Sequence, residues 1–339
     1  MRKGLNPQKD KIEGEIQQYH QVVVPIYIPN EEGFFEHSFE VLKLSLESLF
    51  RTSHKQTYFT IVNNGSHDGI VKYLNTLLEL EQIHELIHTH NIGKVNAVFK
   101  GVSGHQFPLV TVTDADVLFK DGWQKSTYDV FEEFPKTGFV TPTPNAKLLK
   151  FGTFDTIMYY WFSSKMSFKK PLNKDALKSF ADSIENPEFY NEAHLNNILT
   201  LTGKKTNAVV GGGHFVATFR GTVFKNIKER YSKYKLGGKS VREFLDAPVI
   251  KKGYWRLSTQ DNLAFHMGNI AEPWMREALQ QLPESNDSEI SLPKLTDIKR
   301  NWLLYKMKRV FFERILTKKL FWNRFLRRKG LSRGEANQY

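Results

Sequence analysis

The sequence contains no cysteine, which excludes disulfide bonds and thiolate metal sites and favours a reducing compartment. It has no apolar run long enough to span a bilayer, and its polar first twenty residues do not resemble a signal peptide. We therefore expect a cytoplasmic protein without a membrane-spanning segment. With 339 residues, 40% of them hydrophobic and 25% charged, the chain can bury a sizeable core.

The excess positive charge is confined to one end of the chain. The net charge is +12, yet residues 298–330 alone hold 12 Lys or Arg against the single acid Glu313. The body of the chain is therefore close to neutral, and the tail holds the charge.

The most informative stretch is LVTVTDADVLF, at residues 109–119. Its apolar and β-branched start predicts a buried strand that ends at Asp114 and Asp116. Because residues i and i+2 of a strand point the same way, both carboxylates can converge at the carboxyl end, where α/β sheets bind ligands. Such a pair of oxygen ligands suits Mn²⁺ or Mg²⁺ carrying a diphosphate. The alternative is a turn in which one aspartate caps the helix predicted over 122–134.

Strands and helices alternate from residue 22 onwards. Apolar runs predict strands over 22–28, 58–62 and 85–89, followed by the strand that ends at Asp114, and helical patterns separate them. Parallel neighbours need crossover connections, so this order predicts an α/β fold with a mostly parallel sheet flanked by helices.

Four segments resemble, in order and spacing, the nucleotide-binding half of a family 2 glycosyltransferase with the GT-A fold. They are VVVPIYIPNEE at the first strand, IVNNGSHDG at the second, NIGKVNAVFKG after the third and TDADVLF at the fourth. The resemblance covers residues 21 to about 123. It implies metal-dependent, inverting transfer of a hexosyl or N-acetylhexosaminyl group from a nucleotide diphosphate sugar, with a UDP-sugar favoured over a GDP-sugar. The acceptor would be a glycan or a lipid-linked sugar in bacterial surface polysaccharide synthesis.

The resemblance also implies the donor and metal sites. The donor residues would be Pro25, Tyr27, Asn63, Asn64, Lys94, Asp114, Gly212 and Gly213. The metal ligands would be Asp114 and Asp116, with His266 as a candidate third. Asn63 and Asn64 stand where family members commonly have a carboxylate; an amide both donates and accepts, so the preferred base stays open. The alternative for these two residues is an Asn-Gly turn without a ligand.

The acceptor side is implied by two later segments, NAVVGGGHFVATFRG and STQDN. A sugar hydroxyl needs a base that takes its proton, and the position of Asp261 resembles the acid that family 2 enzymes place beside the acceptor. Asp261 is therefore the predicted base, with His214, Arg220 and Gln260 in the acceptor pocket. The alternatives are that Asp261 caps a predicted helical turn and that His214 fills a partly buried strand position.

Proline and polar residues over 279–297 predict a linker. It would separate a polar segment (1–20) and a GT-A catalytic domain (21–278) from a basic amphipathic helical tail (298–339). On a helical wheel the tail's apolar face holds Leu304, Met307, Phe311, Ile315, Trp322 and Phe325. Such a helix suits an anionic membrane surface, contacted through 298–330 at the inner face of the cell membrane. The alternatives are docking on the catalytic domain or on a partner; nucleic acid is not expected, because binding it needs no apolar stripe.

Two other functions fit parts of the sequence. A sugar nucleotidyltransferase would carry a glycine-rich, arginine-containing loop after the first strand, where this chain has PIYIPNEEGF. A lapsed transferase that only binds glycans or membranes would fit the amides at Asn63, Asn64 and Gln260. The retention of three aspartates in the other expected positions argues against that second reading.

Overall fold

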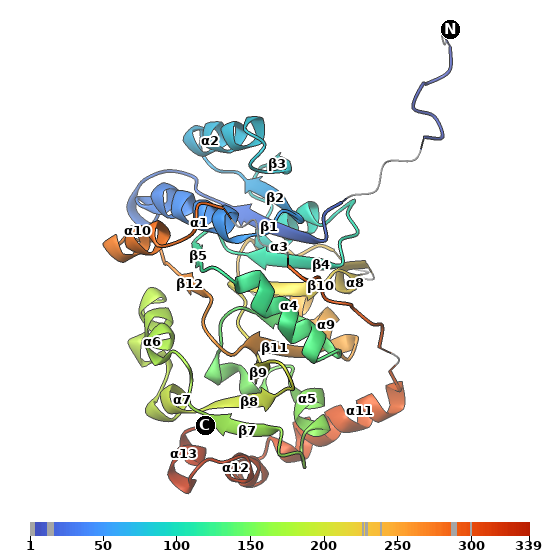
Figure 1. Cartoon of the computed structure of the whole chain (residues 1–339), viewed down its shortest axis with the longest axis vertical. Coiled ribbons are helices and arrows are strands. Elements are labelled where there is room, and N and C mark those ends of the chain that lie inside the picture. Colours follow the sequence, from blue (N-terminus) through green and yellow to red (C-terminus); the bar gives the residue numbers. More distant parts are fainter. Residues whose placement is uncertain are drawn as a thin grey trace.

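The computed structural model describes residues 4–11, 17–225, 227, 230–237, 239–285, 290–298 and 300–339. A ten-stranded sheet runs through the molecule in the order β3-β2-β1-β4-β10-β6-β11-β9-β8-β7 (Figure 1). Its strands are β1 (His20–Ile26), β2 (Thr57–Asn64), β3 (Glu85–Thr89), β4 (Leu109–Thr113), β6 (Thr137–Thr141), β7 (Met166–Lys169), β8 (Ile198–Thr202), β9 (Asn207–Val210), β10 (Val216–Arg220) and β11 (Trp255–Thr259). A separate pair joins β5 (Val117–Phe119) to β12 (Ala264–His266).

The N-terminal half of the sheet is parallel. β1 pairs in parallel with β2 on one side and β4 on the other, and β3 pairs in parallel with β2. Beyond β4, β10 is antiparallel to both β4 and β6, and β11 pairs in parallel with β6. As a result β1, β2, β3, β4, β6, β8 and β11 run in one direction, and β7, β9 and β10 in the other. The predicted α/β fold class is confirmed.

Helices cover both faces of this sheet. The longer ones are α1 (Ser38–Thr52), α2 (Asp68–Glu79), α3 (Lys94–Gly101), α4 (Trp123–Glu133), α6 (Lys174–Ser183), α10 (Pro273–Gln280), α11 (Trp302–Phe311) and α12 (Lys319–Arg328). The shorter ones are α5 (Phe154–Tyr159), α7 (Glu192–Asn196), α8 (Thr222–Lys225), α9 (Ala247–Lys251) and α13 (Arg333–Gln338). Within the described residues, no helix is both long and apolar enough to cross a bilayer.

The double covering follows from strand geometry, because alternate residues of a strand point to opposite faces. From β1, Val22 and Val24 join an apolar cluster with α1 and α2, whereas Val23 joins a second cluster with α3. All three valines are completely buried. Burial on both faces explains why these strands are continuously apolar rather than alternating.

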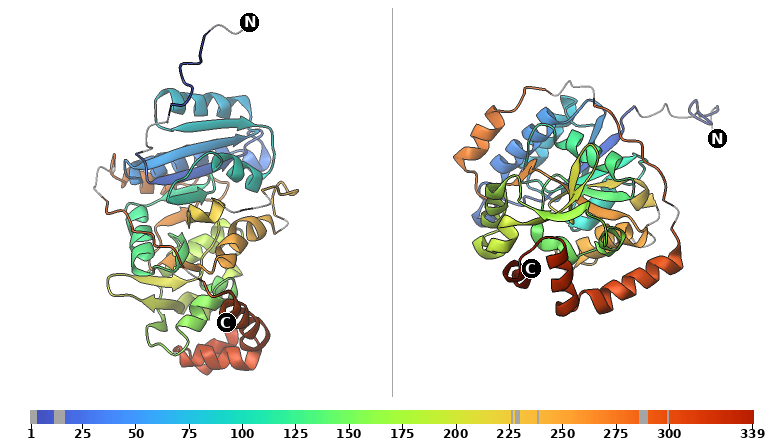
Figure 2. Two further views of the ribbon diagram at one scale, coloured as in Figure 1. Left: turned by 90° about the vertical axis from the view of Figure 1, so that its right-hand side faces the viewer. Right: turned by 60° about the horizontal axis from the view of Figure 1, so that its bottom comes forward.

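The C-terminal helices pack on the body of the molecule at the β7 end of the sheet (Figure 2). The apolar cluster there contains Tyr305, Phe312, Leu316, Trp322, Phe325 and Leu326 from the tail. The rings of Trp161 and Phe325 stack with their centroids 4.7 Å apart. Residues 298–339 are thus integrated into the core, as the docking alternative predicts, rather than hanging free as an appendage.

Three finer expectations need correction or lie outside the described residues. The segment after Asp261 is the strand β12 and not a helical turn. The wheel's single apolar face is divided: Trp322 and Phe325 are buried, whereas Leu304 and Met307 are exposed. The predicted segments 1–20 and 279–297 lie partly outside the described residues, so their boundaries stay predictions.

Candidate active site

A cavity of about 660 Å³ opens where β1, β2 and β4 end. Its lining includes the predicted site residues Pro25, Tyr27, Asn64, Lys94, Asp114, Asp116 and His266. Because parallel strands have their carboxyl ends on the same edge, residues almost a hundred positions apart in the sequence meet here. We refer to this space as the donor cavity.

Asp114 and Lys94 form an ion pair on the floor of the donor cavity. The backbone N–H of Asp114 donates to the carbonyl of Phe215 at 2.7 Å, which fixes the end of β4 against the chain entering β10. Lys94 is the first residue of α3, and its N–H donates to the carbonyl of Lys235 at 2.8 Å. A lysine at a helix N-terminus adds its charge to the positive end of the helix dipole, so this corner of the cavity suits a diphosphate.

Asp116 has a carboxylate with one free oxygen. Its Oδ1 is buried and has no hydrogen-bond partner among the described residues, while Oδ2 lies 3.5 Å from Nε2 of His266. β12 brings this histidine into place, because it pairs with β5 and the N–H of Met267 donates to the carbonyl of Asp116 at 2.8 Å. The other imidazole nitrogen, Nδ1, lies 3.0 Å from Oγ of Ser183. Burial raises the pKa of Asp116, which the neighbouring His266 counteracts.

These side chains fit a divalent cation. A buried carboxylate oxygen without a donor stands next to a second carboxylate and an imidazole, which are ligands that Mn²⁺ accepts. Across the described part of the chain, no group of three or more acidic and histidine side chains is arranged to hold a metal by itself. A cation bound by Asp114 and Asp116 would therefore complete its shell with phosphate and water oxygens, as is usual for Mg²⁺ bound with a nucleotide.

The two asparagines of β2 have different roles. Asn63 accepts from the N–H of Ser66 at 2.9 Å and lies 3.0 Å from Nδ1 of His88, so its side chain holds the turn after β2. Asn64 accepts from the N–H of Ile92 at 2.9 Å and also lines the donor cavity. The turn alternative thus describes Asn63, whereas Asn64 lies where a ligand can reach it.

The predicted glycines and His214 do not line the donor cavity. A Cβ on Gly212 would lie 2.4 Å from Cγ2 of Thr141, so glycine is needed there for packing inside the sheet. Nε2 of His214 lies 3.3 Å from Oδ2 of the fully buried Asp246. Burial and the Arg256 guanidinium lower the pKa of His214 to about 3.

Arg220 is at the opposite end of the sheet, a placement that gives its predicted role in an acceptor pocket no support. It pairs with Leu109, the first residue of β4, and its guanidinium donates to the carbonyls of Thr137, Pro135 and Thr296. β10 runs antiparallel to β4. Its carboxyl end therefore points away from the donor cavity.

Gln260 and Asp261 lie at the end of β11. Oε1 of Gln260 accepts from Nδ2 of Asn207 at 3.0 Å, and Oδ1 of Asp261 accepts from the N–H of Asn262 at 2.7 Å. Neither residue lines the donor cavity or the cavity beside it. This placement gives the base role of Asp261 no support, and that role stays a prediction.

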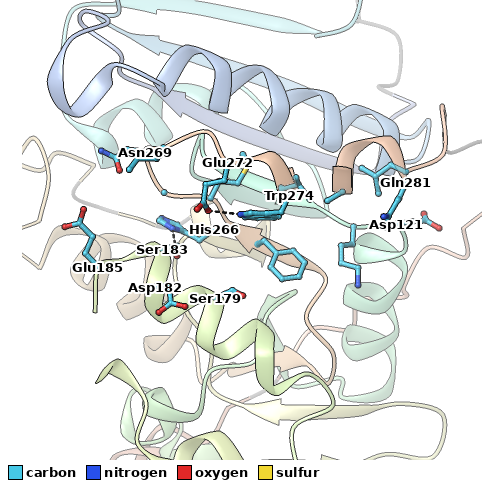
Figure 3. Close-up of a pocket in the computed structure, with 18 residues that line it drawn as sticks. Asp121, Ser179, Asp182, Ser183, Glu185, His266, Asn269, Glu272, Trp274 and Gln281 are labelled. Carbon is cyan, nitrogen blue, oxygen red and sulfur yellow. Dashed lines mark hydrogen bonds between the residues drawn. The ribbon is translucent and has the colours of Figure 1, made fainter. Parts of the chain in front are cut away.

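A second cavity of about 740 Å³ adjoins the donor cavity, and sequence reasoning missed it (Figure 3). Its walls come from β5, α6, β12 and α10, and its polar lining includes Asp121, Ser179, Asp182, Glu185, Glu272 and Gln281. Nε1 of Trp274 donates to Oε2 of Glu272 at 2.7 Å on one wall. The two cavities share Ser183, Glu185, His266, Gly268 and Asn269. No motif marks this space, because it exists only once α6 and the chain after β12 lie side by side.

Solved glycosyltransferases overlap with this chain at low identity. PcManGT, a mannosyltransferase from Pyrobaculum calidifontis in complex with GDP-Man and Mn²⁺, is 13% identical, with a TM-score of 0.38 over 87% of this chain and 61% of that chain. S. aureus TarS 1–349 in complex with UDP-GlcNAc is 11% identical, with a TM-score of 0.42 over 95% of this chain and 70% of that chain. The chain thus spans less than two thirds of that mannosyltransferase chain. Overlaps of this size carry no argument about activity.

A family model matches the N-terminal half of the sequence. Among proteins with curated descriptions, none matches this chain. The model of glycosyl transferase family 2, however, matches from β1 to the last residue of α6, the part that supplies Asp114, Asp116, Lys94 and Ser183. The match covers residues 22–183, so this segment is similar to glycosyl transferase family 2 domains.

Proposed function

We propose that the chain is a metal-dependent inverting glycosyltransferase, moving a hexosyl or N-acetylhexosaminyl group from a nucleotide diphosphate sugar to a hydroxyl. One observation carries the proposal: a family 2 domain places Lys94, Asp114 and Asp116 together in one cavity at the carboxyl ends of its strands. A UDP-sugar is the favoured donor and a GDP-sugar the alternative. The acceptor is a glycan or a lipid-linked sugar of bacterial surface polysaccharide synthesis.

The residues of the donor cavity bind different parts of the donor. Asp116 and Asp114 hold Mn²⁺ or Mg²⁺, and the cation, when bound, offsets the charge that develops on the departing nucleoside diphosphate. Lys94 places a positive charge beside the same phosphates. Tyr27, which is 41% exposed and packs edge-on against Phe35 at 6.0 Å, offers an aromatic wall for the base or ribose.

Titration calorimetry with UDP-GlcNAc, UDP-Glc, UDP-Gal and GDP-Man tests this proposal. We expect at least one donor to bind in Mn²⁺ and to bind much more weakly in EDTA, and we expect Asp116→Ala to remove the difference. Asp129→Ala is the control, because Asp129 is a partly exposed residue of α4 that lies outside the donor cavity and pairs with Lys125 at 2.8 Å. Binding of no nucleotide sugar, or equal binding in Mn²⁺ and EDTA, would contradict the proposal. Release of pyrophosphate from a nucleoside triphosphate and a sugar phosphate would favour a nucleotidyltransferase instead.

The second part of the proposal is that the protein works at the inner face of the cell membrane. Apolar side chains on α11 and α12 are more than 40% exposed although their neighbours are packed: Trp302, Leu303, Leu304, Met307, Val310, Phe311, Leu320 and Phe321. Exposed basic residues of these helices and of the turn between them flank these side chains, among them Lys306, Arg314 and Lys319. Exposed apolar groups within a basic surface suit anionic lipid headgroups.

Co-sedimentation with vesicles tests this second part. The parent should sediment with phosphatidylglycerol-containing vesicles and much less with pure phosphatidylcholine, and raised salt should weaken its binding. Replacing Trp302, Leu303 and Met307 by serine should reduce sedimentation without lowering Tm, because these side chains are exposed. Equal sedimentation of parent and variant, or none by the parent, would defeat the membrane role. Truncation is a poor test, because it would also remove Trp322 and Phe325 from the core.

A further inference from the structure

The donor cavity and the second cavity meet at a narrow set of residues. Five residues line both of them: Ser183, Glu185, His266, Gly268 and Asn269. A group that acts on an acceptor hydroxyl while the donor is bound must reach both spaces. Of these five, Glu185 and His266 have side chains of the kinds that serve as general bases. His266 already lies between Asp116 and Ser183, so Glu185 is left for that task.

The carboxylate of Glu185 is free. It is exposed, and within the described residues it makes no hydrogen bond or ion pair through its side chain. Figure 3 shows it beyond the last turn of α6, at the edge of the second cavity. A carboxylate without a partner, at the border of two cavities, can accept a proton from a hydroxyl group bound there.

The backbone of Glu185 adds an independent observation. Its N–H donates to the carbonyl of Asp182 at 2.9 Å, and the N–H of Asn186 donates to that of Ala181 at 2.9 Å, so α6 ends in a Schellman motif. Glu185 has the left-handed conformation of that motif, with φ of 53°, where glycine is the usual residue. The motif fixes the point from which the Glu185 side chain leaves the backbone.

We propose that Glu185 is the general base of the transfer reaction; this inference rests on the function proposed above. The acceptor hydroxyl lies in the second cavity, and its oxygen forms a bond to the anomeric carbon of the donor. The bond from that carbon to the diphosphate oxygen breaks, and its electron pair leaves with the nucleoside diphosphate. The hydroxyl proton passes to the Glu185 carboxylate, which returns it to water after the product leaves.

Other carboxylates are less well placed. Asp261 lines neither cavity, and Asp182 lines the second cavity alone. Asp114 is paired with Lys94 on the floor of the donor cavity. The second cavity itself fits a sugar acceptor, because acidic and amide side chains can bind hydroxyls and Trp274 offers an apolar ring.

The test measures release of nucleoside diphosphate from the four donors named above, with water and simple methyl pyranosides as acceptors. We expect E185Q to lower the turnover number about 10²-fold to 10⁴-fold, while the donor titration in Mn²⁺ is unchanged. E188Q is the matched control, because Glu188 is exposed, lies three residues on and lines neither cavity. D261N is measured in parallel, because Asp261 is the base that the sequence predicts.

A second variant separates catalysis from folding. E185G supplies the residue that the left-handed position favours, so its Tm should be no lower than that of the parent while its turnover falls as far as that of E185Q. Near-parent turnover by E185Q would overturn the role of Glu185, and a large loss in D261N alone would return that role to Asp261. If the parent neither binds a donor nor releases nucleotide, glycosyl transfer itself fails, which is a different result.

Discussion

The two ends of the central sheet differ in what surrounds their buried polar side chains. At the amino ends of β1 and β2, the Tyr128 hydroxyl lies 2.7 Å from Nδ1 of His20 and 2.7 Å from Nε2 of His54. Gln124 continues this network by donating to Oγ1 of Thr57 at 2.9 Å, and Arg220 donates to three carbonyls nearby. At the carboxyl ends, the buried oxygen of Asp116 without a donor lines the donor cavity, whereas the unpartnered oxygens of Gln21 and Thr137 at the amino ends do not.

This difference assigns the two ends of the sheet to different properties of the protein, its stability and its function. A buried polar group that is fully paired helps to fix a single structure, whereas an unpaired one weakens the fold unless a ligand supplies its partner. The amino ends of the strands therefore stabilise the sheet that holds the carboxyl ends in place. Polar variants at the amino ends should change stability, and those at the carboxyl ends should change donor binding and sugar transfer.

Asp116→Asn should give the largest effect at the carboxyl end. The amide keeps the size of the side chain but binds a cation poorly, so we expect nucleotide release to fall about 10³-fold or more, equal to about 4 kcal/mol. Because burial raises the pKa of Asp116, removing its charge should not lower Tm. Release assays and thermal melts check both results, and a variant that melts earlier while still active would reverse the comparison.

Arg220→Met should give the largest effect at the amino end. The thioether cannot donate, so the carbonyls of Thr137, Pro135 and Thr296 lose a charged partner. We expect the free energy of unfolding to fall by about 3 kcal/mol, with donor affinity unchanged below the melting transition. Urea unfolding and donor titration measure the two quantities. Loss of donor binding in a folded variant would show that the two ends are not independent.

Tyr128→Phe sharpens the comparison with a single atom. Removing the hydroxyl leaves one nitrogen each of His20 and His54 without that partner. The free energy of unfolding should fall by about 2 kcal/mol, because buried polar groups then lose hydrogen bonds. Lys125→Ala is the control, because Lys125 is on the exposed face of α4; it should change the free energy of unfolding by less than about 0.5 kcal/mol.

The pH dependence of stability should spread its effect over several pH units. Burial lowers the pKa of His54 to about 4 and that of His20 well below its usual range. Between pH 4 and the unfolded histidine pKa of about 6.5, the unfolded chain binds more protons than the folded protein does. The free energy of unfolding is therefore highest above pH 6.5 and falls as the pH drops. Each histidine should contribute at most about 1.4 kcal/mol per pH unit. His54→Gln should flatten the slope of unfolding free energy between pH 6.5 and 4.5, and an unchanged slope would contradict this.

The sequence by itself determined the strands of the parallel half and, through the resemblance to family 2 glycosyltransferases, the grouping of Lys94, Asp114 and Asp116. Apolar runs identified β1, β2 and β4, and parallel strands necessarily bring their carboxyl ends to one edge. The contact of His266 with Asp116, proposed from the sequence as a candidate, also occurs, at 3.5 Å. In this half of the sheet each local sequence pattern agrees with the fold, so the sequence was sufficient to predict these strands.

Tertiary structure decided what depends on segments far apart in the chain. The segment after Asp261 has a helical pattern, yet it becomes β12 because it pairs with β5 about 145 residues earlier. Glu185 reaches the border of two cavities only because α6 lies against that strand. In the tail, a π-helical turn at Phe312–Leu316 interrupts the period of 3.6 residues. The single face of the wheel is therefore divided, and packing buries Trp322 while it leaves Met307 exposed.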